Sequence, residues 1–190
     1  MTTLRKGIRF TVWLGLLLTI ALGGCWSYIS KGAQHKFESR EGPFSVTVYP
    51  VSVVRGSRLE HDQDLGQKLV TFLREEGLAD PVSGTPAVGV PVKWGPNEAK
   101  MAQQSASAFA AKVKEAGIQT DYALLAEILC NTDETWVGGV HFYLSDRDGK
   151  LASGGLSNSD WEDFKQVKPH DRQGGYEVLT RMLRRDWKRR

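Results

Sequence analysis

The order of apolar and polar positions divides the chain into a leader, a short connecting segment and one folded body. Residues 10–22 are predominantly apolar, whereas from residue 44 onward apolar side chains recur with the periods of strands and helices. Residues 26–43 show no sustained period and are predicted to form a tether. The body, residues 44–190, falls in the size range of a single domain.

The body alternates strand patterns with helix patterns. Strands are predicted, in chain order, over residues 44–54, 88–93, 121–130, 135–145 and 149–156, and helices over residues 62–76, 97–116 and 174–188. Pro50 predicts an edge, bend or bulge in the first strand, because proline cannot donate to a sheet. The order β-α-β-α-β-β-β-α predicts an α/β (α+β) domain, with helices packed on a mixed sheet.

Capping and turn residues support these boundaries. Gly77 and Gly117 lie where the first two helices should end, and Asn97 can cap the second helix at its start. The alanine-rich interior of residues 97–116 gives a narrow face that suits close packing on a sheet. Asp146–Gly149 predicts a hairpin turn, since glycine accepts the positive φ that such turns require.

The leader has the three parts of an export signal. Three cations, Arg5, Lys6 and Arg9, precede the apolar run, and Leu22-Gly23-Gly24-Cys25 follows it. As a helix, residues 10–22 would span about 20 Å, which is short of the roughly 30 Å hydrocarbon core of a bilayer. A permanent transmembrane helix is therefore the weaker interpretation.

Leu22-Gly23-Gly24-Cys25 resembles the lipobox of bacterial lipoproteins, in which the cysteine thiolate accepts a thioether-linked lipid. The resemblance implies a signal peptide over residues 1–24, cleavage between Gly24 and Cys25, and lipid on Cys25 that holds the protein at a membrane. An uncleaved anchor or ordinary secretion is the alternative. Trp26 replaces the aspartate that favours inner-membrane retention, so the resemblance implies an outer-membrane protein facing the periplasm.

With Cys25 lipidated, Cys130 has no partner for an internal disulfide. It lies in an apolar strand pattern, which favours a buried, inert thiol over a reactive one.

Charge is concentrated at the carboxyl end. Three of the 25 Lys and Arg residues lie in the leader, and the remaining 22 match the 22 Asp and Glu residues of the chain. The last ten residues nevertheless carry six cations and one acid, and Arg181, Arg184, Arg185 and Lys188 lie around the outside of the last predicted helix. They could contact a partner protein or anionic headgroups, or could simply be solvated. Export makes nucleic acid a poor partner.

No pattern of catalytic, cofactor-binding or metal-binding residues is found, so no enzyme activity, cofactor or metal is predicted. His61-Asp62-Gln63-Asp64 is better explained by helix capping than by cation binding, and Asp146-Arg147-Asp148-Gly149 lacks the closing glutamate of a calcium loop. Glu127 interrupts an apolar strand, where it must lie at a sheet edge or be hydrogen-bonded, or else serve as a functional acid.

The element order also resembles the small α/β domain found at the amino terminus of TolB and in curli-secretion and penicillin-binding-protein-activator lipoproteins. The segments that carry this resemblance are VTVYPVSVV, TDYALLAEIL and WVGGVHFYLSDRDGKL. It implies a lipid-anchored, non-enzymatic binding or assembly module for other envelope proteins. A small periplasmic enzyme or ligand-binding protein is the alternative, and a large exposed apolar patch or a deep polar pocket would favour the first or the second, respectively.

Overall fold

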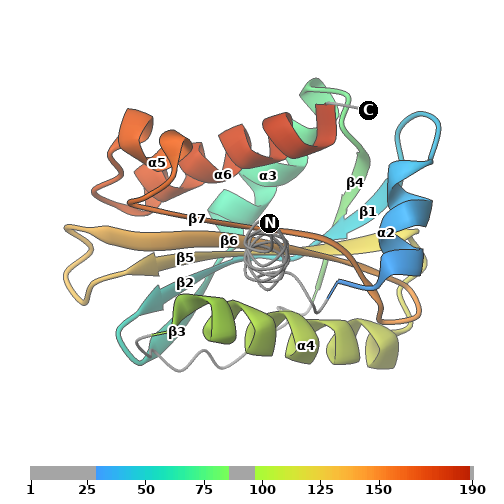
Figure 1. The fold of residues 1–190 in the computed structure, drawn as a ribbon, viewed down its shortest axis with the longest axis horizontal. Coiled ribbons are helices and arrows are strands. Elements are labelled where there is room, and N and C mark those ends of the chain that lie inside the picture. The colour runs from blue at the N-terminus through green and yellow to red at the C-terminus, as the bar shows by residue number, and fades with distance from the viewer. Residues whose placement is uncertain (1–28, 86–96, 189–190) are drawn as a thin grey trace, which may run out of the picture.

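The computed structural model describes residues 29–85 and 97–188, which form five helices and one sheet of seven strands. In chain order the elements are α2 (Lys31–Glu38), β1 (Ser45–Val48), β2 (Val51–Arg55), β3 (Arg58–Asp62), α3 (Gln63–Glu75), β4 (Asp80–Ser83), α4 (Glu98–Ala116), β5 (Tyr122–Cys130), β6 (Val137–Asp146), β7 (Leu151–Asn158), α5 (Glu162–Val167) and α6 (Arg172–Lys188). The predicted α/β class, with helices packed on a mixed sheet, is confirmed (Figure 1).

Strand β5 is the centre of the sheet. On one side it pairs in parallel with β1 along its first half and with β2 along its second half. On the other side it pairs with β6 in antiparallel fashion, and β6 pairs likewise with β7. Beyond this centre, β1 continues to parallel β4 and β2 continues to antiparallel β3.

The predicted first strand is bent at Pro50, as expected. Tyr49 still donates its backbone N–H to Leu124 O at 3.0 Å, after which β2 shifts to the second half of β5. Helix α3 packs closely on this bend, since a Cβ built on Gly66 would lie 3.0 Å from Pro50 Cα. The bend lets one run of sequence pair with both halves of the central strand.

The predicted helix boundaries and the hairpin are confirmed. Asp62 Oδ1 accepts the Leu65 N–H at 2.9 Å at the start of α3, and Asn97 caps α4 in the same way. Gly117 ends α4 in the left-handed region, with a φ of 60°. In the β6–β7 hairpin, Gly149 has a φ of 75° and donates its N–H to Asp146 O at 3.0 Å.

The two faces of the sheet have separate cores. Figure 1 shows α3, α5 and α6 above the sheet and α4 below it. The α6 face buries branched and aromatic side chains such as Leu179, Leu183 and Trp187. The α4 face is narrower, because the helix presents Ala102 and Ala106 to the strands.

The prediction of a tether without regular structure is wrong for residues 31–38, which form α2. Ser30 caps this helix, and Phe37 is fully buried, with ring centroids 5.3 Å from Phe44 and 5.9 Å from Trp187. Only two residues of α2 are buried, so the helix is too short to give a periodic signal.

Strand β3 and helix α5 were also not predicted. Strand β3 is mostly polar, and Arg172 at the start of α6 holds it by donating to Glu60 and Asp62, each at 2.8 Å. The same guanidinium donates to Glu134 at 2.7 Å, which ties the β5–β6 connection to α6. The second predicted strand, residues 88–93, lies outside the described residues, and the structure has β4 just before that segment.

Candidate functional site

The predicted lipidation and cleavage residues, Gly24 and Cys25, lie outside the described residues. Within residues 29–85 and 97–188, no helix is long and apolar enough to cross a bilayer. The described chain begins close to the leader: Ser30 donates its backbone N–H to Leu151 O at 2.9 Å. Four residues, 26–29, therefore separate Cys25 from Ser30, where the chain joins the sheet.

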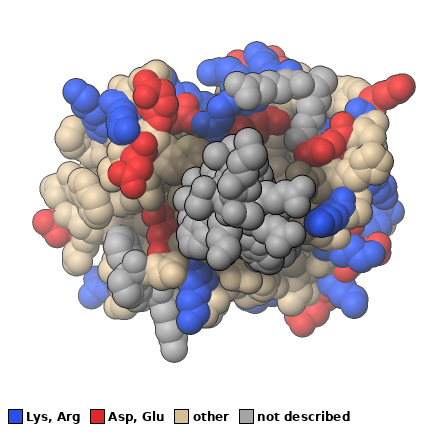
Figure 2. All heavy atoms as spheres, viewed as in Figure 1, with Lys and Arg blue, Asp and Glu red and all other residues tan. Residues whose placement is uncertain are grey.

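The four predicted contact cations of α6 are each paired within the domain. Arg184 and Lys188 share the carboxylate of Glu76, with N–O distances of 2.9 and 2.5 Å, and they hold its pKa at about 2 through these hydrogen bonds. Arg185 pairs with Asp163 and Asp186, and Arg181 pairs with Glu177 one helical turn away. Figure 2 shows basic and acidic side chains interspersed over the face that it draws. The local charge of the sequence is thus largely balanced by acids from α3 and α5 and from α6 itself.

An apolar groove with cations on its rim lies beside α5. We call it the α5 groove; it has a volume of about 360 Å³ and is lined by Trp136, Ser159, Phe164, Lys165, Lys168, Pro169 and His170. The Trp136 side chain is 51% exposed at its edge, and Trp161 at the start of α5 is 43% exposed. Exposed tryptophans of this kind are typical of interaction sites, because the indole buries a large apolar area when a partner covers it.

The two lysines of this groove differ from the cations of α6. Both Lys165 and Lys168 are exposed, and among the described residues no carboxylate forms an ion pair with either. Lys168 also has a φ of 50°, in the left-handed region that favours glycine, where its N–H bonds to Phe164 O at 2.8 Å to end α5. A lysine in this conformation costs backbone energy, and such outliers are concentrated at functional sites.

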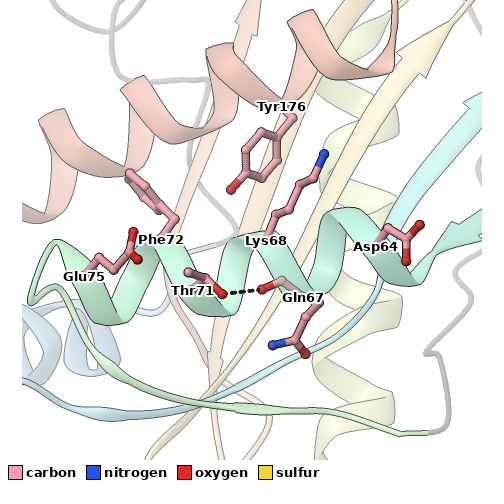
Figure 3. Close-up of a pocket in the computed structure, with 7 residues that line it drawn as sticks. All are labelled: Asp64, Gln67, Lys68, Thr71, Phe72, Glu75 and Tyr176. Carbon is pink, nitrogen blue, oxygen red and sulfur yellow. Dashed lines mark hydrogen bonds between the residues drawn. The ribbon is translucent and has the colours of Figure 1, made fainter.

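A larger groove of about 630 Å³ lies between α3 and α6 (Figure 3). Tyr176 of α6 points toward α3 between Phe72 and Lys68, and burial raises the pKa of its hydroxyl to about 12. Both aromatic rings are half-buried, and the rim carries Asp64 and Glu75 as well as the lysine. The rim of this groove carries two acids and one lysine, whereas the α5 groove has two lysines and no acid in its lining.

A buried polar cluster lies on the α4 face of the sheet. Tyr143 donates its hydroxyl to Glu127 Oε2 at 2.9 Å, and His141 Nδ1 lies 3.1 Å from the same hydroxyl. His141 Nε2 lies 2.9 Å from Glu98 Oε1, and Asn158 donates to the other oxygen of Glu98, Oε2, at 2.7 Å. The cluster joins the first turn of α4 to three adjacent strands.

The geometry of this cluster is that of a protonated histidine. The Tyr143 hydroxyl hydrogen is used by Glu127, so the tyrosine oxygen can only accept from His141 Nδ1, while Nε2 faces the carboxylate of Glu98. Burial alone would lower the pKa of His141, but hydrogen bonds and Coulombic attraction from Glu127 and Glu98 exceed that effect and raise it.

The structure decides between a sheet edge and a hydrogen-bonded side chain for Glu127. The prediction of a sheet edge is wrong, because β5 is central and Glu127 is fully buried, whereas the hydrogen-bonded alternative is confirmed. Its Oε1 atom and the hydroxyl of Ser52, its neighbour in register on β2, have no hydrogen-bond partner among the described residues. The approach of Glu98 depends on Gly139, since a Cβ there would lie 2.2 Å from Glu98 Oε1.

The remaining candidates have structural roles. Cys130 is buried, and desolvation raises the pKa of its thiol to about 11, as expected for an inert cysteine. Asp62 caps α3, and Asp146 Oδ1 accepts the N–H groups of Asp148 and Lys150 at 3.0 and 2.8 Å within the hairpin turn. Across the described part of the chain, no three His, Cys, Asp or Glu side chains converge to hold a metal ion.

Sequence reasoning did not identify the α5 groove. Trp136 lies near the start of a predicted strand, and Trp161 lies outside the predicted elements. The available signal was Trp161, which lies outside every predicted element, together with Trp136 near the start of one, at positions where a core role is not required. Comparison with known proteins adds no assignment, since no protein-family model matches the chain and no curated protein matches it significantly.

Proposed function

We propose that this protein is a lipid-anchored component of the bacterial cell envelope, whose α/β domain binds other envelope proteins without catalysing a reaction. The observation that carries the proposal is the exposed Trp136 in the lining of the α5 groove, with a second exposed tryptophan, Trp161, at the start of α5. Exposed aromatic area beside a groove is a frequent feature of protein-binding surfaces. Leu22-Gly23-Gly24-Cys25 supports the anchor, and Trp26, in place of the aspartate that favours inner-membrane retention, supports a protein at the outer membrane that faces the periplasm.

The anchor is tested by intact-mass measurement of the full chain extracted from membranes. We expect a protein that begins at diacylated or triacylated Cys25, and a Cys25→Ser variant that lacks this mass. A chain that keeps residues 1–24 and carries no lipid as its main species would contradict the anchor.

The binding role is tested by photo-crosslinking in intact cells. A photoreactive amino acid replaces Trp136 in one variant and Lys114, an exposed residue of α4 on the opposite face, in the control. We expect discrete crosslinked proteins from position 136 and none of the same mass from position 114. Identical patterns from both positions would mean that the α5 groove is not a binding surface.

The buried cluster of Glu98, Glu127 and His141 favours a second candidate, a small periplasmic enzyme or ligand-binding protein. A buried acid beside a histidine is an arrangement that active sites use to adjust proton affinity. The discriminating variant is Glu127→Gln, which keeps the side-chain shape. If this variant folds and keeps its crosslinks but the cells show the phenotype of a deletion, the second candidate is supported instead.

A further inference from the structure

We infer that the α5 groove receives an acidic segment of a partner protein, with an apolar side chain seated beside Trp136 and Phe164 and carboxylates placed on Lys165 and Lys168. This inference rests on the proposed function and adds the chemistry of the partner.

The charge around the groove supports an acidic partner. Two neighbouring carboxylates are paired with arginines, Asp163 with Arg185 and Glu134 with Arg172. Glu162, in the first turn of α5, accepts from Gln166 at 2.8 Å and does not line the groove. Asp160 precedes α5 and does not line the groove. Lys165 and Lys168 line the groove and pair with none of these acids, so their positive charge is available to attract and orient acidic groups of a partner.

The size and lining of the groove favour a protein segment over a sugar or a lipid. Its volume of about 360 Å³ is small, with Phe164 and Pro169 buried and Trp136 at the edge, so it suits an apolar side chain. Besides the two lysines, the lining side chains that can hydrogen-bond are Ser159, His170 and the indole N–H of Trp136, whereas the many hydroxyls of a sugar would need more such groups.

The position of the groove also points away from the membrane that would hold Cys25. Trp136 precedes β6 and Ser159 follows β7, whereas the chain joins the sheet at Leu151, the opposite end of β7. The eight residues of β7 span about 26 Å, and the five Cα–Cα steps from Cys25 to Ser30 reach at most about 18 Å. A partner in the periplasm can thus approach the groove while the domain stays anchored.

The test selects peptides against the full lipidated protein in detergent micelles, with a phage library of random 12-residue peptides as the probe. We expect enriched peptides to combine Asp or Glu with an aromatic or aliphatic residue. Their affinity should fall at least tenfold for Trp136→Ala and for the double variant Lys165→Glu, Lys168→Glu, and should fall as salt rises. Lys114→Glu, a charge reversal on the opposite face, should leave affinity unchanged.

A second variant separates binding from folding. Lys168→Gly removes the amine and relieves the left-handed backbone, so we expect an equal or higher Tm together with weaker peptide binding. If Lys168→Gly binds the selected peptides as well as the parent, the lysine is only a helix terminus and the inference fails.

Several outcomes would overturn the inference. These are the absence of any enriched peptide, enrichment without acidic residues, and binding that is independent of Trp136. Sedimentation with vesicles of three parts phosphatidylglycerol to seven parts phosphatidylcholine is measured in parallel. If the parent protein sediments with the vesicles and Trp136→Ala does not, the groove binds a lipid surface instead. If crosslinks from position 136 persist while the peptides show no acid dependence, the proposed function stands and only the partner chemistry is wrong.

Discussion

The carboxyl end of α6 and the α5 groove are neighbouring surfaces that use positive charge in different ways. On α6, Arg184 and Lys188 lie on the carboxylate of Glu76 at the end of α3, so their charge is paired within the domain. Beside α5, Lys165 and Lys168 form no ion pair within the described chain and lie next to exposed tryptophan. The number of cations in a stretch of sequence therefore does not indicate how much charge is available to a partner.

The side of α6 opposite its cations is apolar and packs on the sheet. Its buried apolar side chains are Val178, Leu179, Met182, Leu183 and Trp187, and they pack on the sheet while the cations lie outside. Trp187 also contacts Phe44 and Phe37, with ring centroids 5.3 and 5.9 Å away, so α6 closes the core against α2 as well. The apolar side of α6 belongs to the core, and its paired cations add little to that role.

The largest expected effect comes from removing this apolar side. Truncation after Asp171 deletes five buried apolar side chains, each contributing about 1.5–3 kcal/mol, a sum comparable to the whole stability of about 5–15 kcal/mol. We expect no cooperative thermal transition by circular dichroism. Leu183→Ala, the milder version, should lower the free energy of unfolding by about 2–5 kcal/mol. A truncated chain that melts like the parent would mean that α6 is not part of the core.

Removing one partner of a buried ion pair should lower the free energy of unfolding more than removing one partner of an exposed pair on α6. His141→Leu leaves the buried carboxylate of Glu127 without its cation, so we expect a loss of about 3–5 kcal/mol in the free energy of unfolding. His35→Leu, on the exposed side of α2, is the control and should change little.

The same site predicts a pH dependence. Because the pKa of His141 is raised on folding, its contribution is fully present below the unfolded value of about 6.5 and is lost as pH rises through the folded value. Urea titrations at several pH values should show this decline above about pH 6.5 in the parent and not in His141→Leu. A decline of equal size in both proteins would assign it to other groups.

The fold was predictable wherever local signals agreed with burial. Helices α3 and α4 combine a capping residue, an apolar or small-residue face and a terminal glycine, and the Asp146–Gly149 turn separates two apolar strands. Helices α2 and α5 have one or two buried residues each, and their stability comes from contacts distant in sequence. No local pattern could reveal them.

The candidate site was less predictable for the same reason. Glu76 and Arg184 are 108 residues apart, so the cations of α6 could be predicted from the sequence but their acidic partners could not. Glu127 was recognised as anomalous, but the residues that satisfy it come from β6 and α4 and depend on the register of β5 against β6. Exposure of Trp136 is likewise a property of the tertiary structure.

Paired charge reversals test the comparison directly. Reversal of Lys165 and Lys168 to Glu should reduce crosslinking through position 136 at least tenfold and leave Tm nearly unchanged, because neither lysine supports the fold. Reversal of Arg181 and Arg184 to Glu should leave crosslinking intact and lower Tm by a few degrees. If reversal of Arg181 and Arg184 abolishes crosslinking and reversal of the two lysines does not, the binding surface is the basic end of α6.

The smallest expected effect is the pH response of Glu76. Its pKa is lowered to about 2 by hydrogen bonds from Arg184 and Lys188, so the stabilisation from this group is present above its unfolded pKa and is lost as pH falls through about 2. Replacing both cations with Gln should remove that contribution and leave the fold unchanged, because exposed ion pairs are screened by solvent and salt. Denaturant titrations at pH 7, 4.5, 3 and 2 should therefore show a small difference between parent and variant above pH 4.5, which narrows toward pH 2 and shrinks in 0.5 M salt. A difference that persists unchanged at pH 2 would show that the two side chains stabilise α6 by packing, as with Arg184 over the Phe72 ring at 5.4 Å, and that their charge is not needed for folding.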